Sequence, residues 1–212
     1  MKHIYLIRHW ETEYNREQKY IWWRSDHLEL NWAWIEQARL LWVYLKENEI
    51  SFDKIFASVA VRAKSTAKIS LEIAWMNYGS VLEREDITEL SQWDWTWLER
   101  DKIYTPERIE EIKKDNWNFK APNWESQKDV EERMLAFLND EIISDENENW
   151  NYAVYTHWLA IKCLLRGILL SDPKITYRIE IDNTSITKIT HDKRWFSIDF
   201  VNHVPHFKSC RI

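Results

Sequence analysis

Glycine is almost missing from this chain, and tryptophan is unusually abundant. The 212 residues include 2 glycines and 15 tryptophans, whereas average usage of about 7% predicts roughly 15 glycines. The turns of an α/β protein need residues that tolerate positive φ, which tryptophan adopts only with strain. Several tryptophans nevertheless stand where glycine is expected, such as Trp75 at an apparent helix end and Trp150 in a polar loop. The composition therefore conflicts with the turns that the rest of the sequence predicts.

Other scarcities exclude whole classes of protein. Cys163 and Cys210 fit neither a disulfide framework nor a metal-ligand spacing, and Cys163 lies in an apolar helical run typical of a core. No apolar run reaches the roughly 18 residues that a membrane span needs, and no apolar signal segment opens the chain. We therefore expect a soluble cytoplasmic protein without membrane contacts. The net charge of −6 argues against a broad nucleic-acid surface but allows a local basic pocket for a phosphorylated small molecule.

The first chemically informative stretch follows an apolar run, residues 3–7, that is typical of a buried strand. Arg8 and His9 come at the point where this strand should end, and ligands of open α/β sheets bind outside the carboxyl ends of strands. Arginine offers a planar fork of donors to phosphate oxygens, and histidine can act as a nucleophile. This pairing suggests a phosphate site, although a surface strand end with ordinary polar residues is the plain alternative.

The remaining chain alternates strand-like and helix-like segments. Strands are expected at 54–57, 152–156, 185–190 and 196–201, with an extended stretch at 81–90, and helices at 31–47, 60–74, 106–114, 126–143 and 158–170. This order predicts an α/β fold: a mostly parallel central sheet with helices on both faces. We find no repeat, linker or low-complexity tract, so we expect one domain over residues 1–212.

Two further residues repeat the pattern of charge near a strand end. His157 follows the expected strand 152–156 and precedes a helix. Arg62 lies near the start of the helix expected at 60–74, one turn before Thr66. A cation at a helix N-terminus opposes the helix dipole, and such a local conflict is more common at functional positions. A solvated arginine and a satisfied core histidine remain the ordinary alternatives.

With these residues in view, the sequence resembles the phosphoglycerate-mutase-like branch of the histidine phosphatase superfamily over nearly its whole length. The signature L-x-R-H-G-E-T-x-x-N of that family corresponds to Leu-Ile-Arg-His-Trp-Glu-Thr-Glu-Tyr-Asn at residues 6–15. Its S-x-x-x-R-A-x-x-T-A motif corresponds to residues 58–67, its E-x-x-x-G-x-W-x-G motif to residues 89–97, its G-E-S motif to residues 124–126 and its S-H-G motif to residues 156–158. Asn183-Thr184-Ser185 is similar to its N-x-S before the last strands.

This resemblance implies a metal-independent phosphatase without a cofactor, acting on a small-molecule phosphate ester. It implies that His9 attacks phosphorus and forms a phosphohistidine, with its other ring N–H held by a backbone carbonyl. It further implies that Arg8, Arg62 and His157 surround the phosphoryl oxygens, that Asn15 donates an amide, and that position 158, here Trp158, lies against the phosphate. Glu89 would exchange a proton with the leaving oxygen and then with water, which requires a raised pKa.

The departures from the family pattern share one direction, because tryptophan stands wherever a motif requires glycine. Only Trp95 occupies a position where the family favours tryptophan, and Trp117 replaces no motif glycine. Setting these two aside leaves thirteen tryptophans, which together with the two glycines match the glycine content of an ordinary protein. We therefore hypothesise that the gene reads UGA as glycine and that the sequence was translated with UGA as tryptophan. The test is the gene itself, where UGG or mixed codons at these positions contradict the hypothesis.

We use the name "glycine form" for the chain with glycine at these thirteen positions: Trp10, Trp22, Trp23, Trp32, Trp34, Trp42, Trp75, Trp93, Trp97, Trp124, Trp150, Trp158 and Trp195. Overpacking costs roughly 1–3 kcal/mol per site. Thirteen such sites could exceed a total stability of about 5–15 kcal/mol. We expect the chain as written to misfold or to be inactive.

Two other functions remain open at the level of sequence. A phosphoglycerate mutase would return the phosphate to a second hydroxyl, but mutases of the family tend to carry an insertion after the Glu89 region, whereas residues 101–124 here are short and charged. A phosphate-binding protein on the same fold is the third possibility, because fold does not fix activity. It is disfavoured because the second histidine and Glu89 are present. The sequence names neither the substrate nor the oligomeric state.

Overall fold

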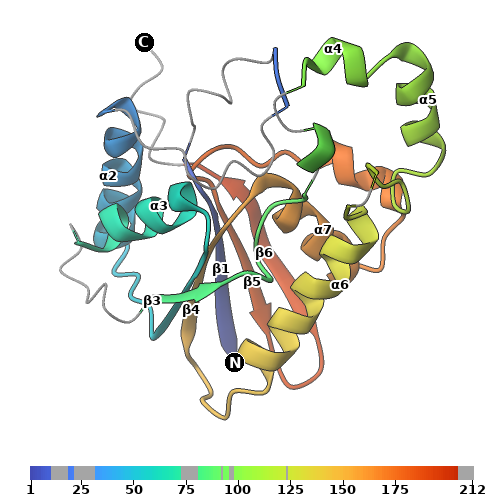
Figure 1. Ribbon diagram of the computed structural model, residues 1–212. Helices are drawn as coiled ribbons and strands as arrows, with labels where there is room; N and C mark the ends of the chain where they lie inside the picture. The colour runs from blue at the N-terminus through green and yellow to red at the C-terminus, as the bar shows by residue number, and fades with distance from the viewer. Residues whose placement is uncertain are drawn as a thin grey trace.

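The chain forms a mixed, mostly parallel β-sheet with helices on both of its faces (Figure 1). The computed structural model describes residues 1–10, 19–21, 32–72, 81–91, 93–95, 98–122 and 124–204, without the side chains of residues 32–38 and 93. The described part of the sheet has six strands in the order β3-β2-β4-β1-β5-β6. β3, β2, β4 and β1 run parallel, β5 pairs antiparallel with β1, and β6 pairs antiparallel with β5. The predicted α/β fold class is therefore confirmed.

The strands are β1 (Lys2–Arg8), β2 (Lys54–Ser58), β3 (Val81–Arg84), β4 (Asn151–Thr156), β5 (Ile186–His191) and β6 (Phe196–His203). The α-helices are α2 (Trp32–Glu47), α3 (Val61–Glu72), α4 (Arg100–Ile103), α5 (Pro106–Lys114), α6 (Gln127–Phe137) and α7 (Trp158–Ile168). Shorter helical turns are η2 (Trp93–Trp95), η3 (Leu138–Ile143) and η4 (Pro173–Arg178). Among the described residues, no helix is long and apolar enough to cross a membrane.

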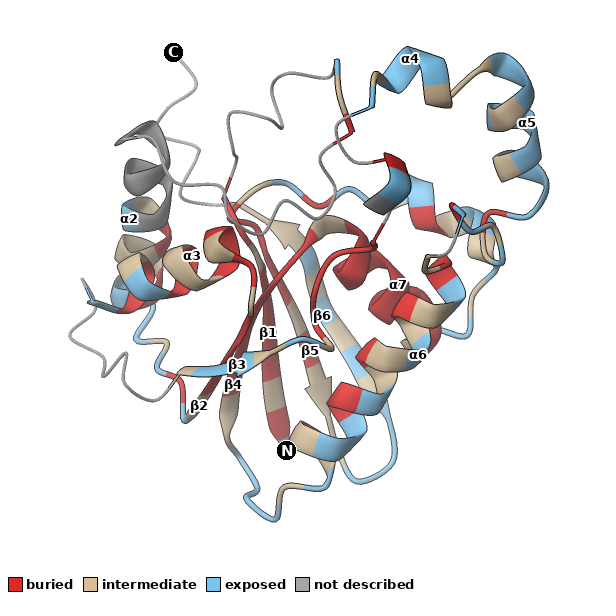
Figure 2. Cartoon of the chain, in the orientation of Figure 1, coloured by how far each residue is buried: buried red, intermediate tan, exposed pale blue. Residues whose placement is uncertain are grey.

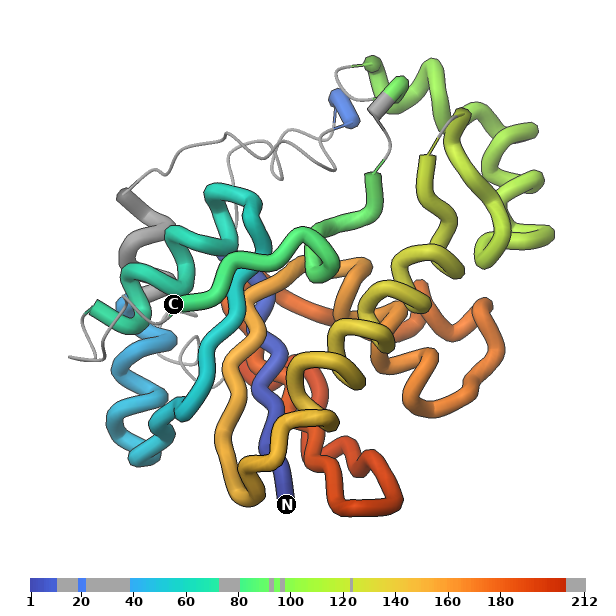
Figure 3. The backbone as a smooth tube through the Cα atoms, turned by 60° about the horizontal axis from the view of Figure 1, so that its bottom comes forward, coloured from blue at the N-terminus to red at the C-terminus, as the bar shows by residue number. Residues whose placement is uncertain are grey.

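The central strand β1 divides the core into two halves because successive side chains point to opposite faces. Ile4 and Leu6 contribute to the cluster beneath α6 and α7. Tyr5 and Ile7 contribute to the cluster beneath α2 and α3. Figure 2 shows β1 and β4 buried in the middle of the sheet. Figure 3 shows the same strands between the two pairs of helices.

Sequence signals account for the ends of several helices. Ser126 caps α6 by accepting from the Asp129 amide, while the Asp129 carboxylate accepts from the Ser126 amide. Thr105 caps α5 in the same manner, ahead of Pro106 at the first helical position. Helix α7 is almost entirely buried because it is apolar on most sides.

Several predicted boundaries differ in the structure. The extended stretch predicted at 81–90 ends as a strand at Arg84, because the Thr88 hydroxyl and amide bond back to the Glu85 carbonyl and turn the chain. The helix predicted at 126–143 ends as an α-helix at Phe137 and continues as the π-helical turn η3. The helix predicted at 158–170 ends at Ile168.

Positive φ occurs at residues other than tryptophan in the described part of the chain. The residues with positive φ are Glu49, Asn149, Leu170, Thr184 and Asn202. The expectation that the loop around Trp150 requires a left-handed residue is met one position earlier, at Asn149, whose side chain tolerates that conformation. Trp75 lies outside the described residues. The case for glycine at the described tryptophans therefore depends on space and hydrogen bonding, not on backbone strain.

Candidate active site

Three neighbouring parallel strands end at the same edge of the sheet and bring the predicted residues together. Arg8 at the end of β1 is paired in register with Thr156 at the end of β4, and β2 lies on the other side of β4. His9 and His157 are the residues that follow β1 and β4, and their ring centroids are 5.0 Å apart. Because residues distant in sequence meet here, this edge is the candidate site.

His9 is held as a neutral imidazole with a defined tautomer. Its Nδ1 lies 2.5 Å from the Trp10 carbonyl oxygen, which can only accept, so the ring proton resides on Nδ1. Its Nε2 accepts from the Arg62 Nε–H at 3.2 Å. Burial, followed by the charges of Arg62 and Arg8, lowers the pKa of His9 well below its ordinary value. His9 Nε2 therefore carries no proton. The ring is oriented by a backbone carbonyl, which is the arrangement that the family resemblance implied.

His157 is held in the opposite sense. Its Nδ1 accepts from the Arg62 guanidinium at 3.1 Å, so its proton lies on Nε2, which donates to the Ser58 hydroxyl at 2.8 Å. Burial and the charge of Arg62 lower the pKa of His157 well below its ordinary value. His157 therefore also carries no charge, and its ring is fixed between α3 and the end of β2.

Arg62 connects the two histidines from the first turn of α3. Its side chain is 4% exposed, and its Nε and terminal nitrogen donate to two different imidazole rings. The position of this turn is set by Thr66, whose hydroxyl donates to the Arg62 carbonyl at 2.6 Å and accepts from the Trp10 amide at 3.3 Å. One side chain thus ties the first turn of α3 to the loop that carries His9.

Glu89 is a buried carboxyl group close to these cations. It is 6% exposed, and its two oxygens accept from the backbone amides of Leu90 at 2.9 Å and Leu159 at 3.2 Å. Burial raises the pKa of Glu89, while the two backbone hydrogen bonds and the charges of Arg62 and Arg8 oppose that rise. Burial is the largest of these influences, so the pKa of Glu89 is raised overall, in the direction that the expected role requires.

Arg8 is anchored from the far side of the site. Its terminal nitrogen donates to the Ile181 carbonyl at 2.6 Å. The loop after Ile181 returns to β1, where the Asn183 amide group donates to the His9 carbonyl at 3.1 Å. Thr184 takes up a positive φ of 54° and donates its own amide to the Arg8 carbonyl. This loop contains the Asn-Thr-Ser sequence noted above, and it fixes the backbone of both Arg8 and His9.

Comparison with known proteins identifies the family of this chain. Residues 4–204 match the model of the histidine phosphatase superfamily (branch 1). The chain belongs to this superfamily. Its curated relatives include a putative phosphoserine phosphatase 2 of Hydrogenobacter thermophilus, 29% identical over 97% of this chain and 98% of the relative. They also include a phosphoglycerate mutase of Schizosaccharomyces pombe, 24% identical over 87% of this chain and 93% of the relative.

A solved structure of the superfamily shows the same architecture. The phosphoserine phosphatase of Entamoeba histolytica, in complex with 3-phosphoglyceric acid, superimposes with a TM-score of 0.80 at 25% identity, covering 97% of this chain and 99% of that one. Phosphatases and phosphoglycerate mutases thus resemble this chain at similar sequence identity. The comparisons identify an enzyme family and leave phosphatase and mutase as alternatives within it.

Most of the superfamily residues quoted from the sequence lie within one small region. Arg8, His9, Arg62, Glu89 and His157 are linked by the hydrogen bonds and charge interactions described above. Asn15, the expected amide donor, lies outside the described residues.

Trp158 begins α7 next to His157. Its indole lies beside the site, where the glycine of the family motif would leave open space. Its ring contacts the Lys162 ammonium at 3.5 Å and stacks at a tilt near Tyr177.

Three other residues of this superfamily member were not assigned a role from the sequence. Ser58 was quoted only as the first letter of a motif, and that motif was the signal that could have identified it as a partner of His157. Lys162 is almost fully buried, and this burial lowers its pKa to about 8. Arg133 contacts the backbone of Glu89 from α6. Nothing in the local sequence distinguishes Lys162 or Arg133 from ordinary helix residues.

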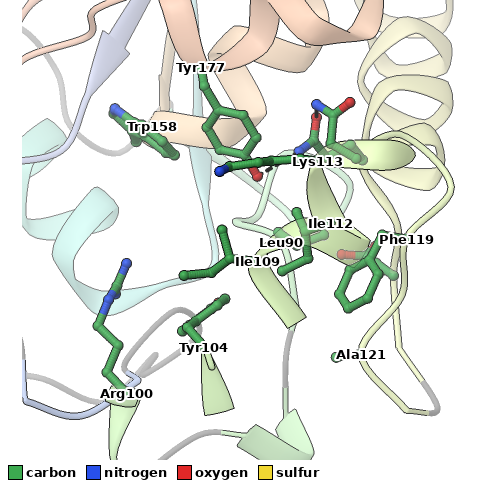
Figure 4. A pocket seen from close by; sticks show the side chains of 13 residues that line it. Leu90, Arg100, Tyr104, Ile109, Ile112, Lys113, Phe119, Ala121, Trp158 and Tyr177 are labelled. Atoms are coloured by element: carbon green, nitrogen blue, oxygen red, sulfur yellow. Dashed lines mark hydrogen bonds between the residues drawn. The ribbon is translucent and has the colours of Figure 1, made fainter. Parts of the chain in front are cut away.

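A pocket of about 340 Å³ opens beside the site (Figure 4). Leu90 and Trp158, the residues after Glu89 and His157, form part of its wall. Most of the remaining wall is apolar or aromatic, and Arg100 and Lys113 supply cations. In Figure 4 the side chains of Ile109, Ile112 and Tyr104 gather below the phenol ring of Tyr177. The pocket has the size of a small-molecule site and includes side chains from α4 and α5.

Proposed function

We propose that this protein is a phosphomonoester hydrolase that acts on a small phosphorylated metabolite through a phosphohistidine on His9. One observation carries the proposal: His9 has its Nδ1 proton committed to a backbone carbonyl and its Nε2 lone pair aimed at a guanidinium. A neutral, oriented imidazole is a competent nucleophile, and a guanidinium beside it can hold the oxygens of the group under attack.

The reaction has two balanced steps. In the first, His9 Nε2 bonds to phosphorus, the ester P–O bond breaks, and Glu89 gives its proton to the departing oxygen. In the second, the Glu89 carboxylate takes a proton from water, the oxygen of that water bonds to phosphorus, and the P–N bond breaks to restore His9. In this proposal Arg8, Arg62 and His157 surround the phosphoryl oxygens. Positioning and charge stabilisation provide most of the catalysis in phosphoryl transfer.

The pocket next to Leu90 supports a hydrolase more than a mutase. A phosphoglycerate mutase has to hold a small, doubly anionic acid in two orientations, which calls for cations around the substrate. Most of the pocket wall is apolar, and its cations, Arg100 and Lys113, lie on α4 and α5. The mutase remains the second candidate because curated relatives of that activity match most of the chain.

The test is hydrolysis of 4-nitrophenyl phosphate by the full-length chain, with the chain as written and the glycine form assayed in parallel. We expect phosphate release by the glycine form and an alkali-stable, acid-labile phosphoenzyme after rapid quench. His9→Ala should abolish both, whereas His191→Ala, a histidine of β5 that packs on Phe196 away from the site, should leave both unchanged. Conversion of 3-phosphoglycerate without phosphate release supports the mutase instead. If the protein shows neither hydrolysis nor conversion, a phosphate-binding protein is supported.

A further inference from the structure

The segment that carries Glu89 is held in place by side chains instead of by the sheet. Strand β3 ends at Arg84, and the following residues have no strand partner in the described part of the chain. The Thr156 hydroxyl, at the end of β4, donates to the Ile87 carbonyl at 2.6 Å. Arg133 of α6 donates to the Asp86 carbonyl at 2.8 Å and to the Glu89 carbonyl at 3.3 Å. The position of the Glu89 backbone therefore depends on contacts from two other elements.

Arg133 is itself oriented by Glu125, the residue before the cap of α6. Its Nε donates to one Glu125 carboxylate oxygen at 2.9 Å, and a terminal nitrogen donates to the other at 3.2 Å. This two-point geometry fixes the plane of the guanidinium and is specific to arginine. The second Glu125 oxygen also accepts from the Ser91 amide at 3.1 Å, so the pair holds the segment on both sides of Glu89.

The pair contacts the backbone of the Glu89 segment, and Glu125 also lines the neighbouring pocket. The side chains of Arg133 and Glu125 are 18% and 25% exposed, and neither contacts His9 or Arg62 in the described hydrogen bonds. Their hydrogen bonds to the segment that carries Glu89 go to the backbone of residues 86–91. The carboxylate of Glu89 is in turn aligned by the amides of Leu90, in that same segment, and of Leu159, at the start of α7.

We propose that Arg133 and Glu125 form a positioning pair that sets the Glu89 carboxyl group at the place where it transfers its proton. This inference rests on the proposed function, in which Glu89 protonates the leaving oxygen. A displacement of about 1 Å of a catalytic group can cost roughly 10²-fold in rate, so loss of the pair weakens proton transfer while His9 stays intact.

The dependence on the leaving group tests this role. The value of kcat/KM reports the first step, in which the alcohol departs. A 4-nitrophenolate leaves without a proton, whereas phenolate and simple alkoxides need one. For Arg133→Met we expect kcat/KM to fall by about 30–100-fold with phenyl phosphate and by less than about 5-fold with 4-nitrophenyl phosphate, since general acid catalysis supplies roughly 10²–10⁴-fold. Arg133→Lys should recover part of the loss, because a lysine can still donate to one carbonyl.

Two further variants separate positioning from folding. Glu125→Gln keeps the shape of the pair but removes its charge, so the same leaving-group pattern is expected at smaller size. Arg84→Met is the matched control, because Arg84 pairs with the Asp86 and Glu141 carboxylates and does not touch the backbone of Glu89. It should change the thermal midpoint without changing the ratio of the two substrates.

A double-mutant cycle with Glu89→Gln completes the test. If Arg133 acts through Glu89, Arg133→Met costs little once Glu89 has been replaced. Equal losses on both substrates, or the same loss in both backgrounds, overturn the positioning role while the proposed function stands. All these variants are made in the glycine form, which is the parent enzyme. If the parent hydrolyses neither ester, or if Glu89→Gln shows no leaving-group dependence, the proposed function fails and this inference fails with it.

Discussion

The substitution of Trp10 by glycine distinguishes two opposite accounts of the tryptophans. Trp10 follows His9, is completely buried, and its indole N–H has no hydrogen-bond partner among the described residues. Its backbone is nevertheless part of the site, because its carbonyl holds His9 Nδ1 and its amide donates to Thr66. A side chain at this position therefore affects the packing directly behind the nucleophile.

The expected magnitude follows from these contacts. If glycine belongs at position 10, returning tryptophan to that position of the glycine form adds overpacking of roughly 1–3 kcal/mol and an unpaired buried donor of about 1–3 kcal/mol. For a domain of this size, 1 kcal/mol corresponds to about 2–4 °C in thermal midpoint. We expect the thermal midpoint to fall by roughly 5–20 °C and phosphatase activity to be lost, because the carbonyl that orients His9 moves with the displaced backbone.

The assay is thermal unfolding followed by circular dichroism, together with hydrolysis of 4-nitrophenyl phosphate. The converse substitution, Trp10→Gly in the chain as written, should raise or preserve the thermal midpoint. If Trp10 is a native core residue, the same substitution instead leaves a cavity, and truncation of a buried aromatic costs about 3–5 kcal/mol. A fall of that size with loss of activity would refute our reasoning.

Three other outcomes test the site. Arg62→Lys should lower kcat by at least about 10²-fold without unfolding the protein, because an ammonium cannot donate to His9 and His157 in the arrangement of a guanidinium; steady-state kinetics and circular dichroism check this. Asn183→Ala should lower kcat by roughly 2–10-fold, since one hydrogen bond to the His9 carbonyl contributes about 0.5–1.5 kcal/mol. A matched Asn48→Ala variant, whose amide group donates to the Tyr44 carbonyl near the end of α2, is the control. The ratio of parent to Glu89→Gln activity on phenyl phosphate should fall as pH rises through the pKa of Glu89, which burial raises, because only the protonated acid assists departure of the alcohol. Taking the ratio cancels the effect of substrate ionisation on both rates. A ratio that is independent of pH contradicts this role of Glu89.

The parts of the fold that depend on local pattern were predictable from the sequence. The apolar run of β1 and the start of the helix at residue 126 are local signals, and both elements begin within one residue of the predicted position. The meeting of His9 and His157 also follows from sequence, since parallel neighbouring strands end at the same edge. The apolar pattern at 81–90 did not predict that β3 ends at Arg84. The turn that follows is closed by a hydrogen bond from the Thr88 side chain, which a pattern of apolar residues does not reveal.

The environment of Glu89 was beyond the sequence for a different reason. Its carboxylate is aligned by an amide seventy residues away, at Leu159, and its backbone is held by Arg133 from another helix. Neither contact has a signature in spacing or composition. The family resemblance named Glu89 as the proton donor, but only the packing of α6 and α7 around its segment provides the burial that raises its pKa.

The protonation states of the site are matched to a doubly charged substrate. Burial and nearby arginines keep His9 and His157 neutral, and burial favours a proton on Glu89. Arg8 and Arg62 bring two positive charges to a phosphate monoester that carries about two negative ones near neutral pH, and the Lys162 ammonium lies nearby. A protonated His9 could not attack, and an ionised Glu89 would repel the substrate and have no proton to give. The two arginines therefore do more than bind phosphate, because their charge also keeps the histidines in the form that can react.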